Sequence, residues 1–375
     1  MVILYRYFCL FLQKLKKIQY MLYIVDNHTN PYWNLAAEEY LFTHFNESIF
    51  RLWRNENAII VGKYQNTLSE IDLQYVKENH IKVVRRLTGG GAVFHDLGNI
   101  NFTFIENKIK GEKTSDMFKR FTSPIIEALN SLGIKAYLEG RNDLLIDGRK
   151  FSGNAICVHN NRILQHGTLL YKVGMNNLSL ALKSKPEKFQ DKAVQSNRSR
   201  VTNISEHLKH SEYIKNKDII SKINNDSNLS KETTSKEINT LEFQGYLGNF
   251  ICKKHSNTII RYHYSKEDLE NIDKLMKSKY ELDEWNFGKS PKYNFQNSAK
   301  YKGGLIELNF SVEKGVITDI KIYGDYFFTL PTEEIYDKLI GVKHTKEELE
   351  KTISNLPIDK YFANITPEEI VKLFF

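Results

Sequence analysis

Short β-branched or aromatic runs separated by turn residues constrain the fold of this chain more than any other feature. Such runs are typical of strands in a sheet with a buried face. They lie at Ile49–Trp53, Ala58–Gly62, Ile81–Arg86, Ala92–His95, Ile100–Ile105 and Leu144–Ile146. Asp147-Gly148 and Asn160-Asn161 fit the two-residue turns of β-hairpins, and the second turn leads into a further strand, Arg162–Tyr171. We therefore expect a sheet that contains hairpins.

Helical patterns accompany these strands, so the predicted fold class is α+β. In the first part of the chain they lie around Leu35–Leu41, at Ser115–Leu132 and around Ile204–His207, which predicts a mixed sheet flanked by helices. Near the C-terminus, two alternating strands precede polar helices: Gly304–Val312, Val316–Tyr323, Thr332–Leu339, Lys346–Ile353 and Thr366–Phe374. This group predicts a small C-terminal α+β accessory domain.

The length of 375 residues, with 41% hydrophobic residues, favours two unequal domains. We expect the fold to begin with a strand at Met21 and place the first domain at 21–284, a linker at 285–291 and the accessory domain at 292–375. Residues 213–240 are rich in Lys, Asn and Ser and poor in aromatic residues. A solvated or disordered insertion explains this segment better than a nucleic-acid-binding arm.

The N-terminal segment resembles an organelle presequence. It is cationic and amphipathic, with Arg6, Lys14, Lys16 and Lys17 among apolar residues and no acidic residue before Asp26. We predict that residues 1–20 are a targeting extension and that the protein is mitochondrial, with a plastid-like organelle or the cytoplasm as alternatives. A second interpretation is that translation starts at Met21 and that the extension is not made.

Charge and cysteine content restrict the partners only partly. The net charge of +8 suits an anionic ligand, an acidic protein partner or nucleic acid, although much of it comes from lysines scattered through polar stretches. Cys9, Cys157 and Cys252 are an odd number at wide spacings, so neither a disulfide framework nor a zinc site is indicated. Because no run of about 18 uncharged apolar residues occurs, we expect no membrane span and no stable membrane association.

The sequence "RRLTGGGAVFHD", residues 85–96, is the first candidate site. Consecutive glycines at a strand turn bring main-chain N–H groups directly against a ligand, most often a phosphate, and arginines can hold phosphate or carboxylate through two hydrogen bonds. Taken alone, three glycines are more often a tight hairpin. Gly288-Lys289-Ser290 imitates the end of a P-loop, but Asp283 replaces its first glycine and Pro291 follows, so we exclude that motif.

A second candidate site is "GRNDLLIDGRKFSGNA", residues 140–155, where Lys150 follows the Asp147-Gly148 turn. A lysine fixed on a hairpin can bridge a phosphate and a carboxylate. A lone Lys150 is more often an exposed strand residue, and only the neighbouring motifs favour a role in a site.

These two stretches together with "LQHGTLLY" closely resemble the lipoate-protein ligase family, whose fold is shared with biotin-protein ligases. The resemblance extends to "WNLAAEEYLF", "LWRNENAIIVGKYQN", "SRVTNI", "WNFGKSP" and "IYGDYFF", and so covers roughly Met21 to the C-terminus. It implies activation of lipoate by ATP to lipoyl-AMP with release of pyrophosphate. The lipoyl group is then transferred to a lysine of a lipoyl domain, in E2 subunits of 2-oxoacid dehydrogenases or in the H protein of glycine cleavage.

The resemblance also implies roles for particular residues. Lys150 contacts both the α-phosphate and the lipoyl carbonyl and acts as the catalytic cation, while Asp143 holds Mg²⁺ (or Mn²⁺), with a structural turn aspartate as the alternative. His95 and His166 shape the pocket wall rather than transfer protons. The implied nucleotide contacts are Arg86, Gly91, Ala92, Val93, Phe94, Asn99 and Lys150, and the implied lipoate contacts are Arg86, Gly89, Gly90, Lys150, His166 and Thr168.

Three other functions fit the sequence less well. An octanoyl- or lipoyl-transferase of the same fold uses a cysteine thioester, but the chain has Arg141-Asn142-Asp143 where such relatives carry the cysteine, and Cys157 fits a part-buried strand residue. A biotin ligase has a different arginine- and glycine-interleaved loop. A nucleic-acid-binding protein would explain the charge but not the glycines and Lys150. We expect a monomeric ligase, with 285–291 as the hinge of a moving accessory domain.

Overall fold

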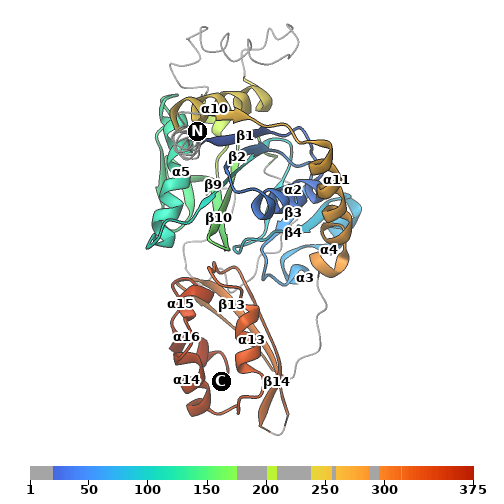
Figure 1. Cartoon of the computed structure of the whole chain (residues 1–375). Helices are drawn as coiled ribbons and strands as arrows, with labels where there is room; N and C mark the ends of the chain where they lie inside the picture. Colours follow the sequence, from blue (N-terminus) through green and yellow to red (C-terminus); the bar gives the residue numbers. More distant parts are fainter. Residues whose placement is uncertain (1–19, 175–200, 209–237, 256–258, 288–294, 314) are drawn as a thin grey trace, which may run out of the picture.

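The computed structural model describes residues 20–174, 201–208, 238–255, 259–287, 295–313 and 315–375. The predicted extension, the predicted insertion and the end of the predicted linker lie almost entirely outside these ranges. Figure 1 shows a large N-terminal unit and a small C-terminal unit beneath it. In the described part of the chain no helix has both the length and the apolar character to cross a membrane.

The large unit is built on a mixed eight-stranded sheet in the order β11-β1-β2-β6-β10-β9-β8-β7. The first three strands are parallel, and every later neighbour is antiparallel. The strands are β1 (Met21–Val25), β2 (Ser48–Trp53), β6 (Asn99–Asn107), β7 (Ala136–Glu139), β8 (Asp143–Ile146), β9 (Arg149–His159), β10 (Arg162–Leu170) and β11 (Ile259–Arg261). Both predicted hairpin turns are confirmed, since their four residues have the positive φ that such turns require.

Each face of this sheet is covered by different elements. Phe50, Phe102 and Phe104 pack on one face against α5 (Thr114–Asn130) and α10 (Thr240–His255). The other face packs against α2 (Pro31–His44), which also contacts a small sheet of β4 (Lys82–Arg85), β3 (Ala58–Val61) and β5 (Val93–His95). The remaining elements are α3 (Thr67–Glu70), α4 (Leu73–Glu78), α8 (Ile204–Leu208), α11 (Lys266–Leu275), the π-helix η3 (Met276–Tyr280) and α12 (Asp283–Asn286).

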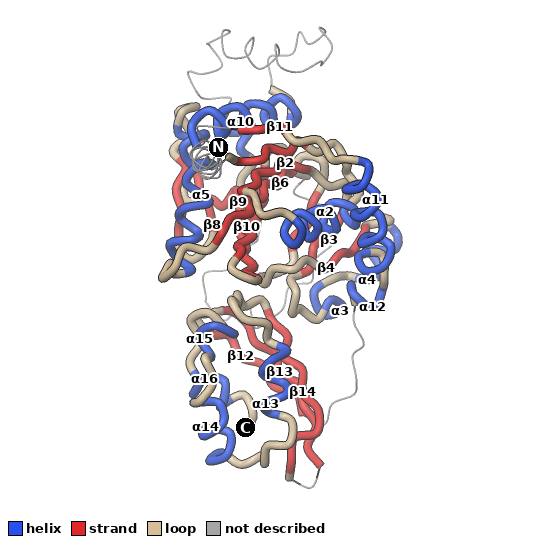
Figure 2. Tube along the Cα trace, viewed as in Figure 1, coloured by secondary structure: helices blue, strands red, loops and turns tan. Residues whose placement is uncertain are grey.

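The small unit has its own core and its own three-stranded antiparallel sheet, and Figure 2 shows helices beside this sheet. Its elements are β12 (Phe295–Tyr301), β13 (Gly304–Glu313), β14 (Val316–Gly324), α13 (Glu333–Leu339), α14 (Lys346–Ser354), α15 (Ile358–Tyr361) and α16 (Pro367–Lys372). The α+β class with a small C-terminal domain is therefore confirmed. The start of the predicted linker differs, because Trp285 and Asn286 form α12 and bind the main chain of Arg85 in β4.

Tyr64 joins the two units. Its ring stacks on Tyr326 with 5.4 Å between ring centroids, and it belongs to the core of the small unit. The Tyr64 hydroxyl donates to a Glu333 carboxylate oxygen at 2.6 Å, and its carbonyl accepts from the Gly324 amide at 2.8 Å. This anchor places the residues just after β14 beside the glycine-rich loop of the large unit.

Candidate active site

A cavity of about 320 Å³ lies between the glycine loop (residues 86–92), the central strands and the segment after β14. Its inner end is closed and includes apolar side chains, since Leu35, Trp53 and Ile60 are at most 2% exposed. Its mouth is open and charged, because the side chains of Lys150 and Asp143 are 40% and 39% exposed. The cavity therefore suits a ligand with an apolar tail and an anionic head.

Nine of the twelve predicted site residues line this cavity: Arg86, Gly90, Gly91, Ala92, Val93, Asp143, Lys150, His166 and Thr168. They come from stretches that are far apart in the sequence. The glycine loop, the hairpin of β8 and β9, and β10 meet here because β10 lies beside β9 in the sheet.

Phe94, Asn99 and Gly89 do not line the cavity, which differs from the predicted contacts. Successive side chains of a strand point to opposite faces, so Val93 faces the cavity and Phe94 packs into a separate apolar cluster. Asn99 is fully buried and donates to the Asn101 side chain at 2.9 Å. Gly89 lies against the backbone of Tyr326 instead.

The strand register explains why the cavity forms at this end of the sheet. Three rows of side chains share the face beneath α2: Ile49, Ile105, Leu164 and Cys157, then Arg51, Thr103, His166 and Ala155, then Trp53, Asn101 and Thr168. The first row is apolar and packs in the core, and the second binds the polar side chains of α2. The third row borders the cavity, so one face of the sheet contains both apolar core and part of the candidate binding site.

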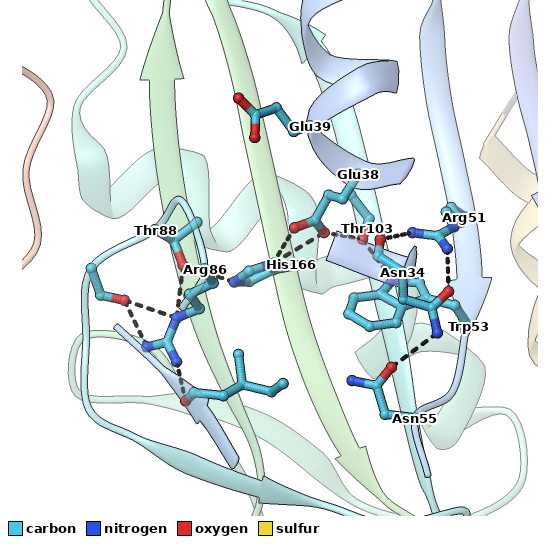
Figure 3. A network of polar contacts seen from close by, with 12 residues as sticks. Asn34, Glu38, Glu39, Arg51, Trp53, Asn55, Arg86, Thr88, Thr103 and His166 are labelled. Atoms are coloured by element: carbon cyan, nitrogen blue, oxygen red, sulfur yellow. Dashed lines mark hydrogen bonds and ion pairs between the residues drawn. The ribbon is translucent and has the colours of Figure 1, made fainter. Parts of the chain in front are cut away.

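A buried polar network connects the second row to the glycine loop (Figure 3). His166 Nδ1 lies 2.9 Å from a Glu38 carboxylate oxygen, and His166 Nε2 lies 2.8 Å from Thr88 Oγ1. Because a carboxylate only accepts hydrogen bonds, His166 Nδ1–H donates to Glu38, and Thr88 Oγ1 also accepts from Arg86 Nε. Burial alone would raise the pKa of Glu38, but His166 and further hydrogen bonds bring it below its usual value. The network therefore fixes the orientation of the His166 ring.

Arg86 holds the glycine loop in shape. Its guanidinium donates to the carbonyls of Gly89 and Gly91 at 2.8 Å each and to that of Ile60 at 3.0 Å. Burial lowers the pKa of Arg86 to about 10, which still leaves it charged at neutral pH. Most of its N–H groups are occupied by these bonds, so in this structure Arg86 orients the loop more than it offers donors to a ligand.

Lys150 stands at the mouth of the cavity at the start of β9. Its ammonium lies 2.8 Å from Asp143 Oδ1 on the neighbouring strand β8. The backbone behind it is braced, because Thr202 donates its N–H to the Lys150 carbonyl at 2.9 Å and Val201 forms a β-bridge with it. Val201 and Thr202 of the "SRVTNI" stretch thus support the lysine that faces the cavity.

Asp143 and Asp325 are the carboxylates that line the cavity. Among the described residues, no three His, Cys, Asp or Glu side chains come together as a metal site. Mg²⁺ beside nucleotide phosphates takes only one or two protein carboxylates, so these residues suit a metal that is bound largely by the nucleotide.

Gly89 accommodates the small unit, which the sequence alone did not indicate. A Cβ at Gly89 would lie 2.2 Å from the Tyr326 carbonyl oxygen, whereas a Cβ at Gly91 would meet no atom closer than 4.0 Å. Gly89→Ala is therefore expected to displace the small unit and Gly91→Ala to leave it in place. Small-angle scattering of the ligand-free proteins checks this as a larger radius of gyration for Gly89→Ala alone. Equal radii for both variants would contradict it.

His95 is a buried neutral group. It is 3% exposed, and burial lowers its pKa from 6.5 to about 3. The unfolded chain therefore binds this proton first, and stability is lost as the pH falls below about 6.5. Between pH 7 and pH 5 the unfolding free energy of the wild type should fall by about 2 kcal/mol more than that of His95→Gln. Urea unfolding at both pH values tests this, and parallel losses would refute it.

Cys157 lies outside the cavity. It belongs to the apolar first row, opposite Leu164, and packs with Ile49, Ile105 and Leu41. Burial raises its pKa to about 12, so its thiol is protonated at neutral pH. Because a thiolate is the nucleophile in thioester chemistry, this environment does not suit the cysteine route.

Several cavity residues escaped prediction because only tertiary contacts bring them there. Asn101 lies in a strand whose sequence is typical of a buried core strand, and Asp325 and Phe327 belong to the small unit. Arg141 also lines the cavity, and its guanidinium lies 4.2 Å from the centre of the Phe327 ring. Glu38 and Thr88 lie in motifs that we noted, "WNLAAEEYLF" and "RRLTGGGAVFHD", without a role of their own.

Comparison with known proteins agrees with this geometry. Residues 30–225 match the family described as lipoyl protein ligase A/B catalytic domain, and residues 290–374 match the bacterial lipoate protein ligase C-terminus. The chain belongs to the lipoate-protein ligase family. Lipoate-protein ligase LplJ of Bacillus subtilis is 38% identical over 95% of the chain and 100% of its own length. Lipoate-protein ligase 1 of Staphylococcus aureus is 37% identical over 93% of the chain and 98% of its own length.

Solved structures of family members share the fold. P. falciparum LipL1, crystallised in complex with lipoate, aligns with a TM-score of 0.67 and 26% identity over 90% of this chain and 94% of its own. The bipartite lipoate protein ligase from Thermoplasma acidophilum, studied with its E2 lipoyl domain, aligns with a TM-score of 0.59 and 25% identity over 74% of this chain and 100% of its own. This chain is thus similar to ligases along nearly its whole length.

Proposed function

We propose that this ligase activates lipoate with ATP, releases pyrophosphate and transfers the lipoyl group from lipoyl-AMP to a lysine of a lipoyl domain. The observation that carries the proposal is one cavity whose closed apolar end leads to Lys150 and the glycine loop at its mouth. An acyl tail fits the closed end, and its carboxylate then reaches the charged mouth. Family membership and the lipoate complex of LipL1 support the choice of acid.

The first step brings a carboxylate onto the α-phosphorus of ATP, so two anions must be held in line. Lys150 would neutralise the charge that both groups share, and later polarise the acyl carbonyl of the mixed anhydride when an amine attacks. Main-chain N–H groups of Gly91, Ala92 and Val93 would bind the nucleotide. Gly90, His166 and Thr168 would contact the acyl chain, and Arg86 would keep the loop in its binding conformation.

Mg²⁺ is part of the proposal. Asp143 would hold it, with Asp325 close to the same cavity. When bound, the metal offsets phosphate charge and orients the leaving pyrophosphate. The ion pair between Asp143 and Lys150 would place this charge beside the reacting carboxylate.

The proposed acceptors are lipoyl domains of 2-oxoacid dehydrogenase E2 subunits or the glycine cleavage H protein, and the proposed enzyme is a monomer. The structure of the Thermoplasma ligase with its E2 lipoyl domain supports the first class. A net charge of +8 would favour encounter with acidic acceptors, and the association rate would then fall with added salt.

The test is pyrophosphate release by the full chain with ATP, Mg²⁺ and lipoate, together with the mass of an added lipoyl domain. Release that depends on lipoate, a lipoylated acceptor and unchanged rates in Cys157→Ala are the expected results. Absence of release, combined with acyl transfer from a carrier thioester that Cys157→Ala abolishes, would overturn the ligase in favour of the transferase.

Mitochondrial localisation stays a prediction, because residues 1–19 lie outside the described residues and the two curated relatives compared are bacterial. It rests on the cationic amphipathic pattern alone. Fusion of residues 1–25 to a fluorescent reporter tests it, and a diffuse cytoplasmic signal would refute it.

A further inference from the structure

An irregularity in the pairing of β8 with β9 lies beside Lys150. Leu144 is opposite Ser152, but Leu145 is opposite Lys150, so β9 contains one extra residue at this point. Such a β-bulge changes the direction in which the neighbouring side chains of a strand point, and bulges are frequent next to active sites. The bulge therefore decides which side chain of this part of β9 faces the cavity.

The side chains around the bulge show its effect. In a regular strand, successive side chains alternate between the two faces of the sheet. Gly153 and Ala155 line the cavity. A regular β9 would therefore turn Phe151 to the cavity and Lys150 away from it. Instead Phe151 is fully buried in the core beneath α5, and Lys150 lines the cavity. The extra residue thus lets one strand bury an aromatic side chain and present its lysine to the site.

Gly153 leaves the space that the end of the Lys150 side chain needs. A Cβ at Gly153 would lie 3.1 Å from Lys150 Nζ and 3.3 Å from Lys150 Cε, closer than ordinary van der Waals contact. Asp143, whose Oδ1 lies 2.8 Å from the same ammonium, is directly opposite Gly153 in the pairing of β8 with β9. The ammonium can approach Asp143 at this place because no side chain stands beside it.

The backbone at position 153 does not itself require glycine. Gly153 is not among the glycines with a positive φ, so the backbone conformation also suits alanine. Its N–H donates to the Thr168 hydroxyl at 3.2 Å, a bond that alanine can also make. Space for Lys150 is therefore the property that a side chain at this position would remove.

We infer that Gly153 is a positioning residue that, together with the bulge, sets the place of the Lys150 ammonium. This inference rests on the proposed function, in which Lys150 must contact a carboxylate and a phosphate at once. An added methyl group would move the flexible end of the lysine rather than the backbone, because Nζ and Cε are the atoms that it meets. A displacement of about 1 Å in a reacting geometry can lower a rate by about 100-fold.

The test is Gly153→Ala in the full chain, with pyrophosphate release from ATP, Mg²⁺ and lipoate as the first readout. We expect kcat to fall by about 10–100-fold with little change in KM, because the substrates still bind while the charge is misplaced. The same substitution added to Lys150→Ala should lower the rate no further, since Gly153 acts through Lys150. Equal losses in both backgrounds would show a general effect on the fold and overturn the inference.

Gly245→Ala is the matched control. Gly245 lies in α10, where a Cβ would meet no atom within 4 Å, so this variant should retain the full rate. Crystal structures of the wild type and Gly153→Ala supply a second readout that needs no turnover. In the variant, Lys150 Nζ should no longer lie within ion-pair distance of Asp143 Oδ1.

The outcomes separate the two proposals. An unchanged rate in Gly153→Ala, or an ammonium that stays in place, overturns the positioning role and leaves the ligase intact. Absence of pyrophosphate release by the wild type overturns the ligase itself. The two crystal structures then decide whether Gly153 sets the place of Lys150, because the position of the ammonium does not depend on the reaction.

Discussion

Lys150→Ala is expected to lower lipoate-dependent pyrophosphate release by about 10²–10³-fold, the usual cost of removing one preorganised charge-stabilising group. Its ammonium faces the mouth of the cavity from a braced strand. Most of the loss should fall on kcat, because the charge is needed when the carboxylate meets the phosphate. Single-turnover assays with saturating ATP measure this step.

Two comparisons make the Lys150 result specific. Lys135→Ala removes an exposed lysine that does not line the cavity, and should retain full activity. Lys150→Arg keeps the charge but changes the shape of the head group, and should recover only part of the rate. If Lys150→Ala and Lys135→Ala release pyrophosphate equally fast, Lys150 is not the catalytic cation.

Glu38→Leu is expected to cost about 3–5 kcal/mol of unfolding free energy, the range found when one partner of a buried charged pair is removed. Glu38 is 1% exposed and accepts from Thr103 at 2.7 Å as well as from His166. Its loss leaves the Thr103 hydroxyl hydrogen and His166 Nδ1–H buried without their acceptor. Urea unfolding at pH 7 measures the change.

Glu39→Leu provides the matched comparison for Glu38→Leu. Glu39 points out of the network, pairs with Lys279 at 2.8 Å where both side chains retain some exposure, and accepts from the Tyr280 hydroxyl at 2.7 Å, so its loss should cost less, about 1–2 kcal/mol. The Glu38 contribution should also shrink below about pH 4.5, because the folded-state pKa of Glu38 is lowered and its stabilising effect is lost as the pH falls. Equal costs for the two variants would contradict the role of the network.

Local signals predicted most of the strands and the hairpins, because turn residues and alternation act over a few neighbours. Asp147-Gly148 and Asn160-Asn161 are examples, and both turns are where the sequence places them. The helix α10 and the strand β11 were missed. β11 is three residues long and forms by parallel pairing with β1. Because β1 lies at the start of the large unit in the sequence, no local pattern indicates this pairing.

The candidate site was predictable where it depends on motifs, and missed where it depends on packing. Lys150 and the glycines were found because family motifs contain them. No local pattern separates Glu38 from Glu39, yet one is buried beside His166 and the other lies near the surface. Likewise, Gly89 was predicted to contact the ligand, because the sequence does not show that the Tyr326 carbonyl occupies the space beside it.

The ion pair between Lys150 and Asp143 bears on whether the enzyme acylates its own lysine. A ligase that makes an activated acyl group beside one of its lysines risks acylating itself. An ammonium held 2.8 Å from a carboxylate has no lone pair with which to attack, so it can polarise the acyl group without capturing it.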